Sequence, residues 1–127
     1  MNKTIRDVMT AMPHTIGVDQ KISTAKEMMR THNVRHLPVN SAGKLVGILT
    51  QRDVTLALAI DKVSPERLTV EDVYIPEPFV VRPTDDLKSV AATMAREKFG
   101  CALVMDGEKI IGIYTTVDAC RDLAAML

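Results

Sequence analysis

Two copies of a Thr-x-x-Asp motif are the residues of this sequence best suited to chemistry. Thr50 precedes Asp53 and Thr115 precedes Asp118, each time where a strand-like run, Gly-Ile-Leu-Thr or Gly-Ile-Tyr-Thr, meets a helix-like run. A helix N-terminus carries unpaired N–H groups and a partial positive charge, so it can accept a phosphate. A carboxylate one turn into the helix can accept hydrogen bonds from ribose hydroxyls. One interpretation of the motif is therefore a site for a ligand that carries ribose and phosphate.

The same spacing also fits a purely structural role. A Thr at the N-cap and an acidic residue at the third helical position form a capping box. Thr4 with Asp7 and Thr69 with Asp72 show this spacing at the start of two short helical turns, which favours capping on local sequence alone. The Thr hydroxyl can cap a helix and still reach a phosphate, but an Asp cannot easily serve both roles at once.

Both motifs belong to an internal repeat with a spacing of 65 residues. Residues 1–62 align with residues 66–127 without a gap and share thirteen identical positions, where composition alone would give about 4. A repeat of this length indicates a supersecondary unit that needs its neighbour to bury its apolar face. We therefore predict two repeats, 1–62 and 66–127, that together form one compact domain.

Each repeat predicts the same order of elements: strand, helix, strand, strand and helix. A proline forces an extended segment after the first helical turn, apolar stripes predict helices, and short apolar runs joined by turn residues predict hairpins. The fold class is thus α/β (α+β), with two β-α-β-β-α repeats related by a pseudo-two-fold axis and sheets packed face to face. In the first repeat the expected elements are a turn at 4–7, an extended segment at 14–18, a helix with the stripe Ile22, Ala25, Met28, Met29 and His32, strands at 36–39 and 45–49, and a helix at 52–60. In the second they are a turn at 69–72, an extended segment at 79–82, a helix with the stripe Leu87, Val90, Ala91, Met94 and Ala95, strands at 102–105 and 110–114, and a helix from 117 to the end.

The composition excludes several classes of function. Sixteen basic residues balance sixteen acidic ones, so no overall field attracts nucleic acid or an anionic membrane. No apolar run reaches the roughly 18 residues that span a bilayer, and the N-terminus lacks the apolar stretch of a signal peptide. We expect a soluble, cytoplasmic protein without nucleic-acid or membrane partners.

The histidines and cysteines carry weaker signals. His32 and His36 are four residues apart, but the helix is expected to end near Asn33, so the two rings would not share a face, and no cluster of ligands completes a metal site. Cys101 and Cys120 do not form a disulfide framework, and we interpret both as half-buried thiols with no base in reach. We therefore predict no metal, no catalytic cofactor and no enzymatic activity.

The whole chain resembles a tandem pair of cystathionine-β-synthase (CBS) domains, the Bateman module. The resemblance rests on VMTAMPHTI, HLPV and GKLVGILTQRD in the first repeat and on VYIPEPFVV, ALVM and GEKIIGIYTTVD in the second. It implies a regulatory module that binds an adenosyl ligand, such as AMP, ADP, ATP or S-adenosylmethionine, in two clefts between the repeats. In such modules the Asp of the motif binds ribose and the Thr contacts phosphate.

The resemblance also implies the remaining site residues. In these modules the adenine slot is lined by the extended segment after the first short helix and by the second strand of the opposite repeat. One cleft would then combine Thr115 and Asp118 with His14, Ile16, Arg35, His36 and Pro38, and the other would combine Thr50 and Asp53 with Phe79, Val81, Cys101 and Leu103.

The two clefts are expected to differ in strength. Arg35-His36 matches a variant seen in nucleotide-binding members of this family, whereas Gly100-Cys101 occupies the equivalent place in the second repeat. A guanidinium adds charge-assisted hydrogen bonds to a phosphate that Gly and Cys cannot supply. We therefore predict that the Asp118 cleft binds phosphate more tightly. The Asp53 cleft is expected to bind more weakly, with Arg52 partly compensating, or to suit a less charged adenosyl group.

The C-terminal helix predicts an interface between proteins. Residues 119–127 include Leu123, Ala124, Met126 and Leu127 and are more apolar than a lone surface helix should be. In the resembling family such modules associate through their helices into a disc-like homodimer, which we expect here together with an unidentified regulated protein. Two functions remain open: a ligand-sensing regulatory module, and a ligand-free module for dimerisation or protein interaction.

Overall fold

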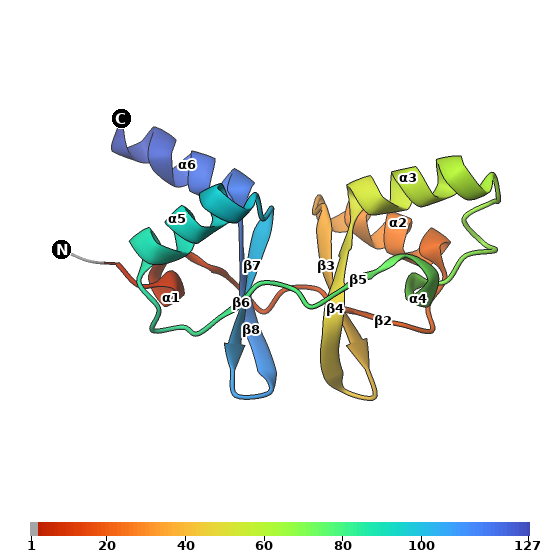
Figure 1. Ribbon diagram of the computed structural model, residues 1–127, viewed down its shortest axis with the longest axis horizontal. Helices are drawn as coiled ribbons and strands as arrows, with labels where there is room; N and C mark the ends of the chain where they lie inside the picture. Colours follow the sequence, from red (N-terminus) through yellow and green to blue (C-terminus); the bar gives the residue numbers. More distant parts are fainter. Residues whose placement is uncertain (1–2) are drawn as a thin grey trace. The chain divides into compact units, whose positions relative to one another are not determined.

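The structure is a computed structural model that describes residues 3–127, and the chain divides into two compact units (Figure 1). The middle unit is formed by residues 14–78. The terminal unit is formed by residues 3–13 together with residues 79–127. These units differ from the sequence repeats. The opening segment of the first repeat belongs to the terminal unit, together with the rest of the second repeat, and the opening segment of the second repeat belongs to the middle unit, together with the rest of the first.

The middle unit contains a four-stranded sheet with the strand order β2-β3-β4-β5. The β2–β3 pair is parallel, and the β3–β4 and β4–β5 pairs are antiparallel. Helix α2 buries Ile22, Ala25 and Met29 in the core, as its apolar stripe predicts, against residues of β3 such as Leu37. The elements are β2 (Ile16–Gly17), α2 (Ile22–His32), β3 (His36–Ser41), β4 (Lys44–Thr50), α3 (Gln51–Asp61), α4 (Val70–Val73) and β5 (Ile75–Pro76).

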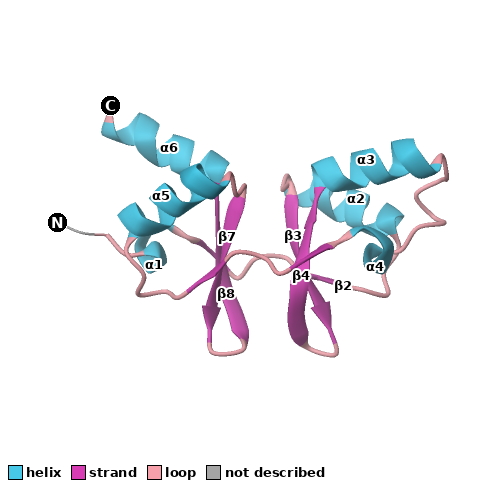
Figure 2. Ribbon diagram, in the orientation of Figure 1, coloured by secondary structure: helices cyan, strands magenta, loops and turns pink. Residues whose placement is uncertain are grey.

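The terminal unit has the same topology, with the strand order β1-β8-β7-β6. The β6–β7 pair is parallel, and the β7–β8 and β8–β1 pairs are antiparallel. Val90 and Met94 of its first long helix pack in the core against Tyr114. Within each unit, the long helices lie on the same face of the sheet (Figure 2). The elements are α1 (Ile5–Val8), β1 (Thr10–Ala11), β6 (Val80–Val81), α5 (Leu87–Glu97), β7 (Cys101–Asp106), β8 (Lys109–Thr115) and α6 (Thr116–Met126).

The long elements recur at the spacing of 65 residues predicted from the sequence. Both hairpins and both pairs of long helices follow this spacing, and their ends lie within one or two residues of the predicted ones. The capping boxes predicted at Thr4 and Thr69 are confirmed, since each Thr N–H donates a 2.9 Å hydrogen bond to the Asp three residues later. The long helices have 11 residues each, and no helix in the described part of the chain could span a membrane.

The two-residue strands β1 and β5 were not predicted, and they close one edge of each sheet. In the terminal unit Ala11 of β1 pairs with Gly112, and in the middle unit Pro76 of β5 pairs with Gly47. The approach is so close that a Cβ on Gly112 would overlap the Met9 sulfur, and a Cβ on Gly47 would overlap the Ile75 carbonyl oxygen. This contact explains why both repeats carry glycine at this position.

Candidate functional site

The first Thr-x-x-Asp motif caps helix α3. Thr50 ends strand β4 and is the N-cap; its Oγ1 accepts a 3.1 Å hydrogen bond from the Asp53 N–H and donates a 2.7 Å bond to Asp53 Oδ2. The Gln51 N–H donates a 2.9 Å hydrogen bond to the Arg35 carbonyl oxygen. Capping by Thr50 is therefore confirmed. The Thr50 hydroxyl and the Arg35 carbonyl together occupy two of the N–H groups that a phosphate would otherwise meet at this helix end.

The second motif caps helix α6 and holds its carboxylate more completely. Thr115 Oγ1 accepts a 3.2 Å hydrogen bond from the Asp118 N–H, and the Thr115 N–H donates a 2.9 Å bond to Asp118 Oδ2. The Arg121 guanidinium pairs with Asp118 Oδ1. Both oxygens of Asp118 thus have partners, whereas Oδ1 of Asp53 accepts no hydrogen bond from residues 3–127.

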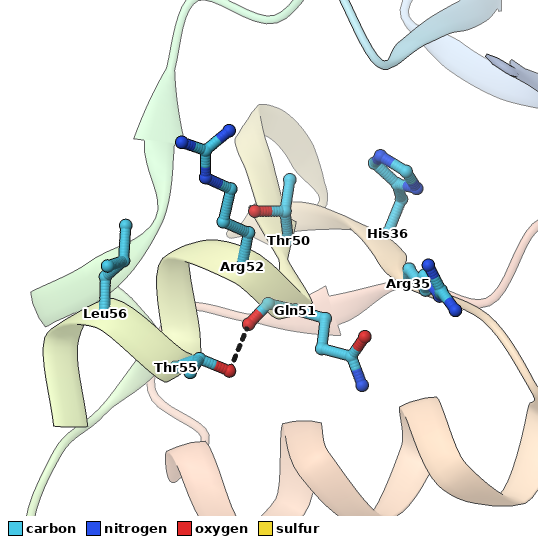
Figure 3. A pocket seen from close by; sticks show the side chains of 7 residues that line it. All are labelled: Arg35, His36, Thr50, Gln51, Arg52, Thr55 and Leu56. Atoms are coloured by element: carbon cyan, nitrogen blue, oxygen red, sulfur yellow. Dashed lines mark hydrogen bonds between the residues drawn. The ribbon is translucent and has the colours of Figure 1, made fainter. Parts of the chain in front are cut away.

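A pocket of about 340 Å³ opens beside Thr50 in the middle unit (Figure 3). The register of β3 and β4 places His36 directly opposite Thr50. Figure 3 shows the side chains of Arg52 and His36 on either side of Thr50. The lining residues are Arg35, His36, Thr50, Gln51, Arg52, Thr55 and Leu56.

This pocket is basic. Arg35 and Arg52 are exposed, and their guanidinium groups form no ion pair with any residue between 3 and 127. None of the lining residues carries a carboxylate. Two guanidinium groups in the lining of one pocket suit an anion such as a phosphate. The equivalent positions in the terminal unit, Gly100 and Val117, carry no charge.

The predicted apolar site residues of the first repeat lie at the sheet of the middle unit. Ile16 on β2 and Pro38 on β3 are buried. His14 precedes β2, and its ring stacks on that of His32 with centroids 3.6 Å apart and planes 12° apart. His32 therefore packs with His14. His32 and His36 belong to different elements, as expected from the sequence, because helix α2 ends at His32 and His36 begins β3. Among residues 3–127, no group of three or more His, Cys, Asp or Glu side chains could hold a metal ion.

Their counterparts in the second repeat lie at the sheet of the terminal unit. Val81 on β6 and both Cys101 and Leu103 on β7 are buried. Phe79 is half-buried, and its ring lies against that of Phe99 with centroids 5.0 Å apart. An aromatic ring thus stands just before the parallel edge strand in both units, His14 before β2 and Phe79 before β6, which fits a slot for a planar base.

The expectation that both cysteines are half-buried is wrong. Cys101 is buried, because it begins β7 between two neighbouring strands, whereas Cys120 is exposed on helix α6. Burial raises the pKa of the Cys101 thiol to about 12. The thiol is therefore protonated at neutral pH and a poor nucleophile.

The structure brings together residues that the sequence assigned to different clefts. Arg35 and His36 share a pocket with Thr50, whereas the sequence analysis placed them with Asp118. The register of the β3–β4 hairpin, which sets His36 opposite Thr50, was the signal that could have shown this grouping. Sequence reasoning also missed the pocket residues Gln51, Thr55 and Leu56 and the partner of Asp118, Arg121. The two clefts between the repeats stay predictions.

Comparison with known proteins identifies the family. Residues 5–60 and 70–125 each match the model of the CBS domain. The protein MJ1225 of Methanocaldococcus jannaschii is 33% identical over 126 residues, which cover 98% of this chain and 44% of that protein. This chain spans between 22% and 44% of the first three curated relatives it matches, and two of those are named as enzymes.

Two solved structures with bound adenosyl compounds share the fold. The CBS domain pair of protein MJ0100, in complex with 5′-methylthioadenosine and S-adenosyl-L-methionine, has a TM-score of 0.91 at 26% identity, and the match covers both chains completely. The protein CBSX2 in complex with AMP has a TM-score of 0.79 at 28% identity over 97% of each chain. Since the two matches to the family model cover most of the sequence, this chain belongs to the CBS domain family.

Proposed function

We propose that this chain is a regulatory module that binds an adenosyl ligand and passes the binding signal to a partner protein. The observation that carries the proposal is the basic pocket beside Thr50, lined by Arg35 and Arg52, whose guanidinium groups form no ion pair within residues 3–127. The similar MJ0100 domain pair binds 5′-methylthioadenosine and S-adenosyl-L-methionine, and CBSX2 binds AMP. A pocket that can take a phosphate supports an adenine nucleotide as the ligand of this chain.

The proposed roles follow the chemistry of each group. Asp53 and Asp118 accept hydrogen bonds from ribose hydroxyls, and the pocket beside Thr50 holds a phosphate through its guanidinium groups. Because the Gln51 and Asp53 N–H groups already have partners, charged side chains contribute more to phosphate binding than the helix end does. The adenine is proposed to lie along β2 and β3, near His14, Ile16 and Pro38, or along β6 and β7, near Phe79, Val81 and Cys101.

The pocket leads us to rank the two motifs differently from the sequence. The sequence favoured Asp118 because it assigned Arg35 and His36 to that cleft. In the structure these two residues line a pocket with Thr50, at the motif of Asp53. We therefore propose that the phosphate of an adenine nucleotide binds beside Thr50.

Thermal unfolding with and without ligand tests the proposal. A ligand that binds only the folded protein at 100 times its Kd stabilises it by about 2.7 kcal/mol, so AMP, ADP, ATP or S-adenosylmethionine at millimolar concentration is expected to raise the Tm by several degrees. The matched control is the Arg35→Ala, Arg52→Ala double variant, which should lose most of the shift with AMP but keep the shift with adenosine. A folded protein whose Tm responds to none of these compounds would exclude the proposed function.

A second candidate function, ligand-free dimerisation, is favoured by exposed apolar side chains on the last helix of each repeat. Ile60 on α3 and Met126 on α6 are 75% and 82% exposed, and Leu56, Val117 and Leu123 are also exposed. Such faces usually pack against another protein, and we propose that the chain forms a homodimer. Sedimentation with and without AMP separates the candidates: a stable dimer whose Tm no adenosyl compound changes supports the ligand-free module.

We assign this chain no catalytic role of its own, and we propose that it acts in the cytoplasm. Its Cys101 thiol is protonated at neutral pH, because burial raises its pKa to about 12. Both cysteines are free, which suits a reducing compartment that also contains adenine nucleotides.

A further inference from the structure

The carboxylates of the two Thr-x-x-Asp motifs differ in what lies three residues further along the helix. After Asp118 this residue is Arg121, whose guanidinium pairs with Asp118 Oδ1 while the Thr115 N–H bonds to Oδ2. After Asp53 the equivalent residue is Leu56, which lines the pocket and has no group to pair with a carboxylate. Within the described residues, the repeat thus presents the same carboxylate once with a cationic partner and once without.

The pair between Arg121 and Asp118 is easy to open. The Arg121 side chain is 68% exposed and the Asp118 side chain 11% exposed, so the guanidinium stays hydrated when it leaves while the carboxylate keeps its place. Only the Arg121 half of the pair is exposed, and a pair at a helical spacing of three whose cation is solvated contributes little stability. Its opening is therefore a small cost that a ligand can meet on binding.

We infer that Arg121 is a positioning residue that competes with bound ribose for Asp118 and so lowers the affinity of this motif for adenosyl ligands. The inference rests on the proposed function, because it requires Asp118 to accept ribose hydroxyls. A ribose diol that donates one hydrogen bond from each hydroxyl uses both oxygens of a carboxylate. Arg121 occupies Oδ1 of Asp118 until the guanidinium is displaced. At Asp53 the diol meets no such competitor.

The inference is tested with adenosine, measured by NMR titration in an Asp53→Ala background that leaves only the Asp118 motif. Adenosine has a diol but no phosphate, so the charge of Arg121 does not attract it directly. Arg121→Leu, which copies the other repeat, is expected to lower the Kd of adenosine by roughly two- to fivefold, in line with the modest strength of an ion pair whose cation is solvated. Arg121→Lys retains a competing cation and should restore most of the original Kd.

Two matched controls separate competition for ribose from a structural effect. 2′,3′-Dideoxyadenosine lacks the diol, so its Kd should be the same with Arg or Leu at position 121. Conversely, Leu56→Arg in an Asp118→Ala background should weaken adenosine binding by a similar factor. Circular dichroism of each variant verifies that helix α6 or α3 remains folded.

Each outcome decides the inference. An adenosine Kd that is unchanged or higher in the Arg121→Leu variant overturns it, and so does equal tightening for the dideoxy compound, because that would show a change in structure rather than competition. If the unmodified chain binds neither adenosine nor AMP, the proposed function fails and the inference fails with it. If the unmodified chain binds both and Arg121→Leu has no effect, only the inference fails.

Discussion

The Tyr114 hydroxyl donates a 2.8 Å hydrogen bond to Asp122 Oδ2 and so joins strand β8 to helix α6. The ring of Tyr114 is buried, and Asp122 is half-buried. The equivalent residues of the first repeat are Leu49 and Ala57, which can only pack. One unit therefore fixes its last helix with a polar bond at a place where the other relies on apolar contact.

Tyr114→Phe is expected to reduce the free energy of unfolding by about 1–2 kcal/mol, because it leaves the half-buried Asp122 carboxylate without its donor. Urea denaturation measures this loss. The other tyrosine provides the control, since the Tyr74 hydroxyl makes no hydrogen bond with residues 3–127, and Tyr74→Phe should change stability by less than about 0.5 kcal/mol. Equal losses in the two variants would contradict a specific role for the Tyr114–Asp122 bond.

Stability is expected to fall in alkaline solution because of buried acids. Burial raises the pKa of the Cys101 thiol from 9.0 to about 12, and burial together with the Asp122 hydrogen bond raises the pKa of Tyr114. Each group loses its proton at lower pH in the unfolded chain than in the folded one, so its contribution is complete below its unfolded pKa and is lost as the pH rises toward its folded pKa. The limiting slope for each group is about 1.4 kcal/mol per pH unit.

Cys101→Ala separates the thiol contribution from the rest. The variant should lose less stability than the unmodified chain between pH 8 and pH 11, whatever its stability at pH 8, and urea denaturation at several pH values measures the two slopes. Cys120→Ala, at an exposed thiol, is the control and should retain the original slope. Parallel slopes for Cys101→Ala and the unmodified chain would contradict the prediction.

Gly47→Ala is expected to destabilise the protein more than Gly112→Ala. A Cβ at position 47 would overlap a backbone carbonyl oxygen, that of Ile75, whereas a Cβ at position 112 would overlap the end of the flexible Met9 side chain. Backbone shifts caused by overpacking cost about 1–3 kcal/mol, and a Met side chain can rotate away at smaller cost. Thermal unfolding of the two variants provides the comparison, and a larger loss for Gly112→Ala would show that β1 is the less adaptable of the two edge strands.

Asp53→Ala is expected to weaken AMP binding more than Asp118→Ala. The basic pocket lies beside Thr50, and Asp118 already holds Arg121, so the Asp53 motif combines a phosphate site with an available carboxylate oxygen. Loss of hydrogen bonds to a charged group corresponds to about a tenfold or greater rise in Kd, which calorimetric titration resolves. The reverse order would support the ranking predicted from the sequence, in which Arg35 and His36 serve the Asp118 cleft.

The sequence predicted the helices and strands well because the repeat supplies each pattern twice. Met29 and Met94, for example, mark the buried face of equivalent helices, and both are buried. The strands β1 and β5 could not be predicted, because two residues carry no periodicity and their pairing depends on the close approach to Gly112 and Gly47. Tertiary contact, rather than local preference, determines these strands.

The candidate site was predicted only in part, because some of its residues are brought together by tertiary contacts. The capping role of Thr50 is local and was correctly expected. The grouping of Arg35 and His36 with Thr50 depends on the register of a hairpin, which turn length and a bulge after Val39 decide. Arg121 follows Asp118 by three residues, a spacing at which opposite charges on a helix can pair. The spacing alone did not predict the pair, because many charges at this spacing do not interact measurably.

Each repeat contributes its opening segment to the unit that contains the rest of the other repeat, and this exchange determines how such a protein can arise and fold. Val70 completes the core of the middle unit, and Ile5 completes that of the terminal unit, so each core needs a residue from the other repeat. A single repeat on its own would lack that residue and an edge strand, and two separate copies could complete each other only by association that depends on concentration. Joining the copies in one chain replaces this encounter by an effective concentration on the order of millimolar, so that a step which would be bimolecular becomes part of the folding of a single molecule.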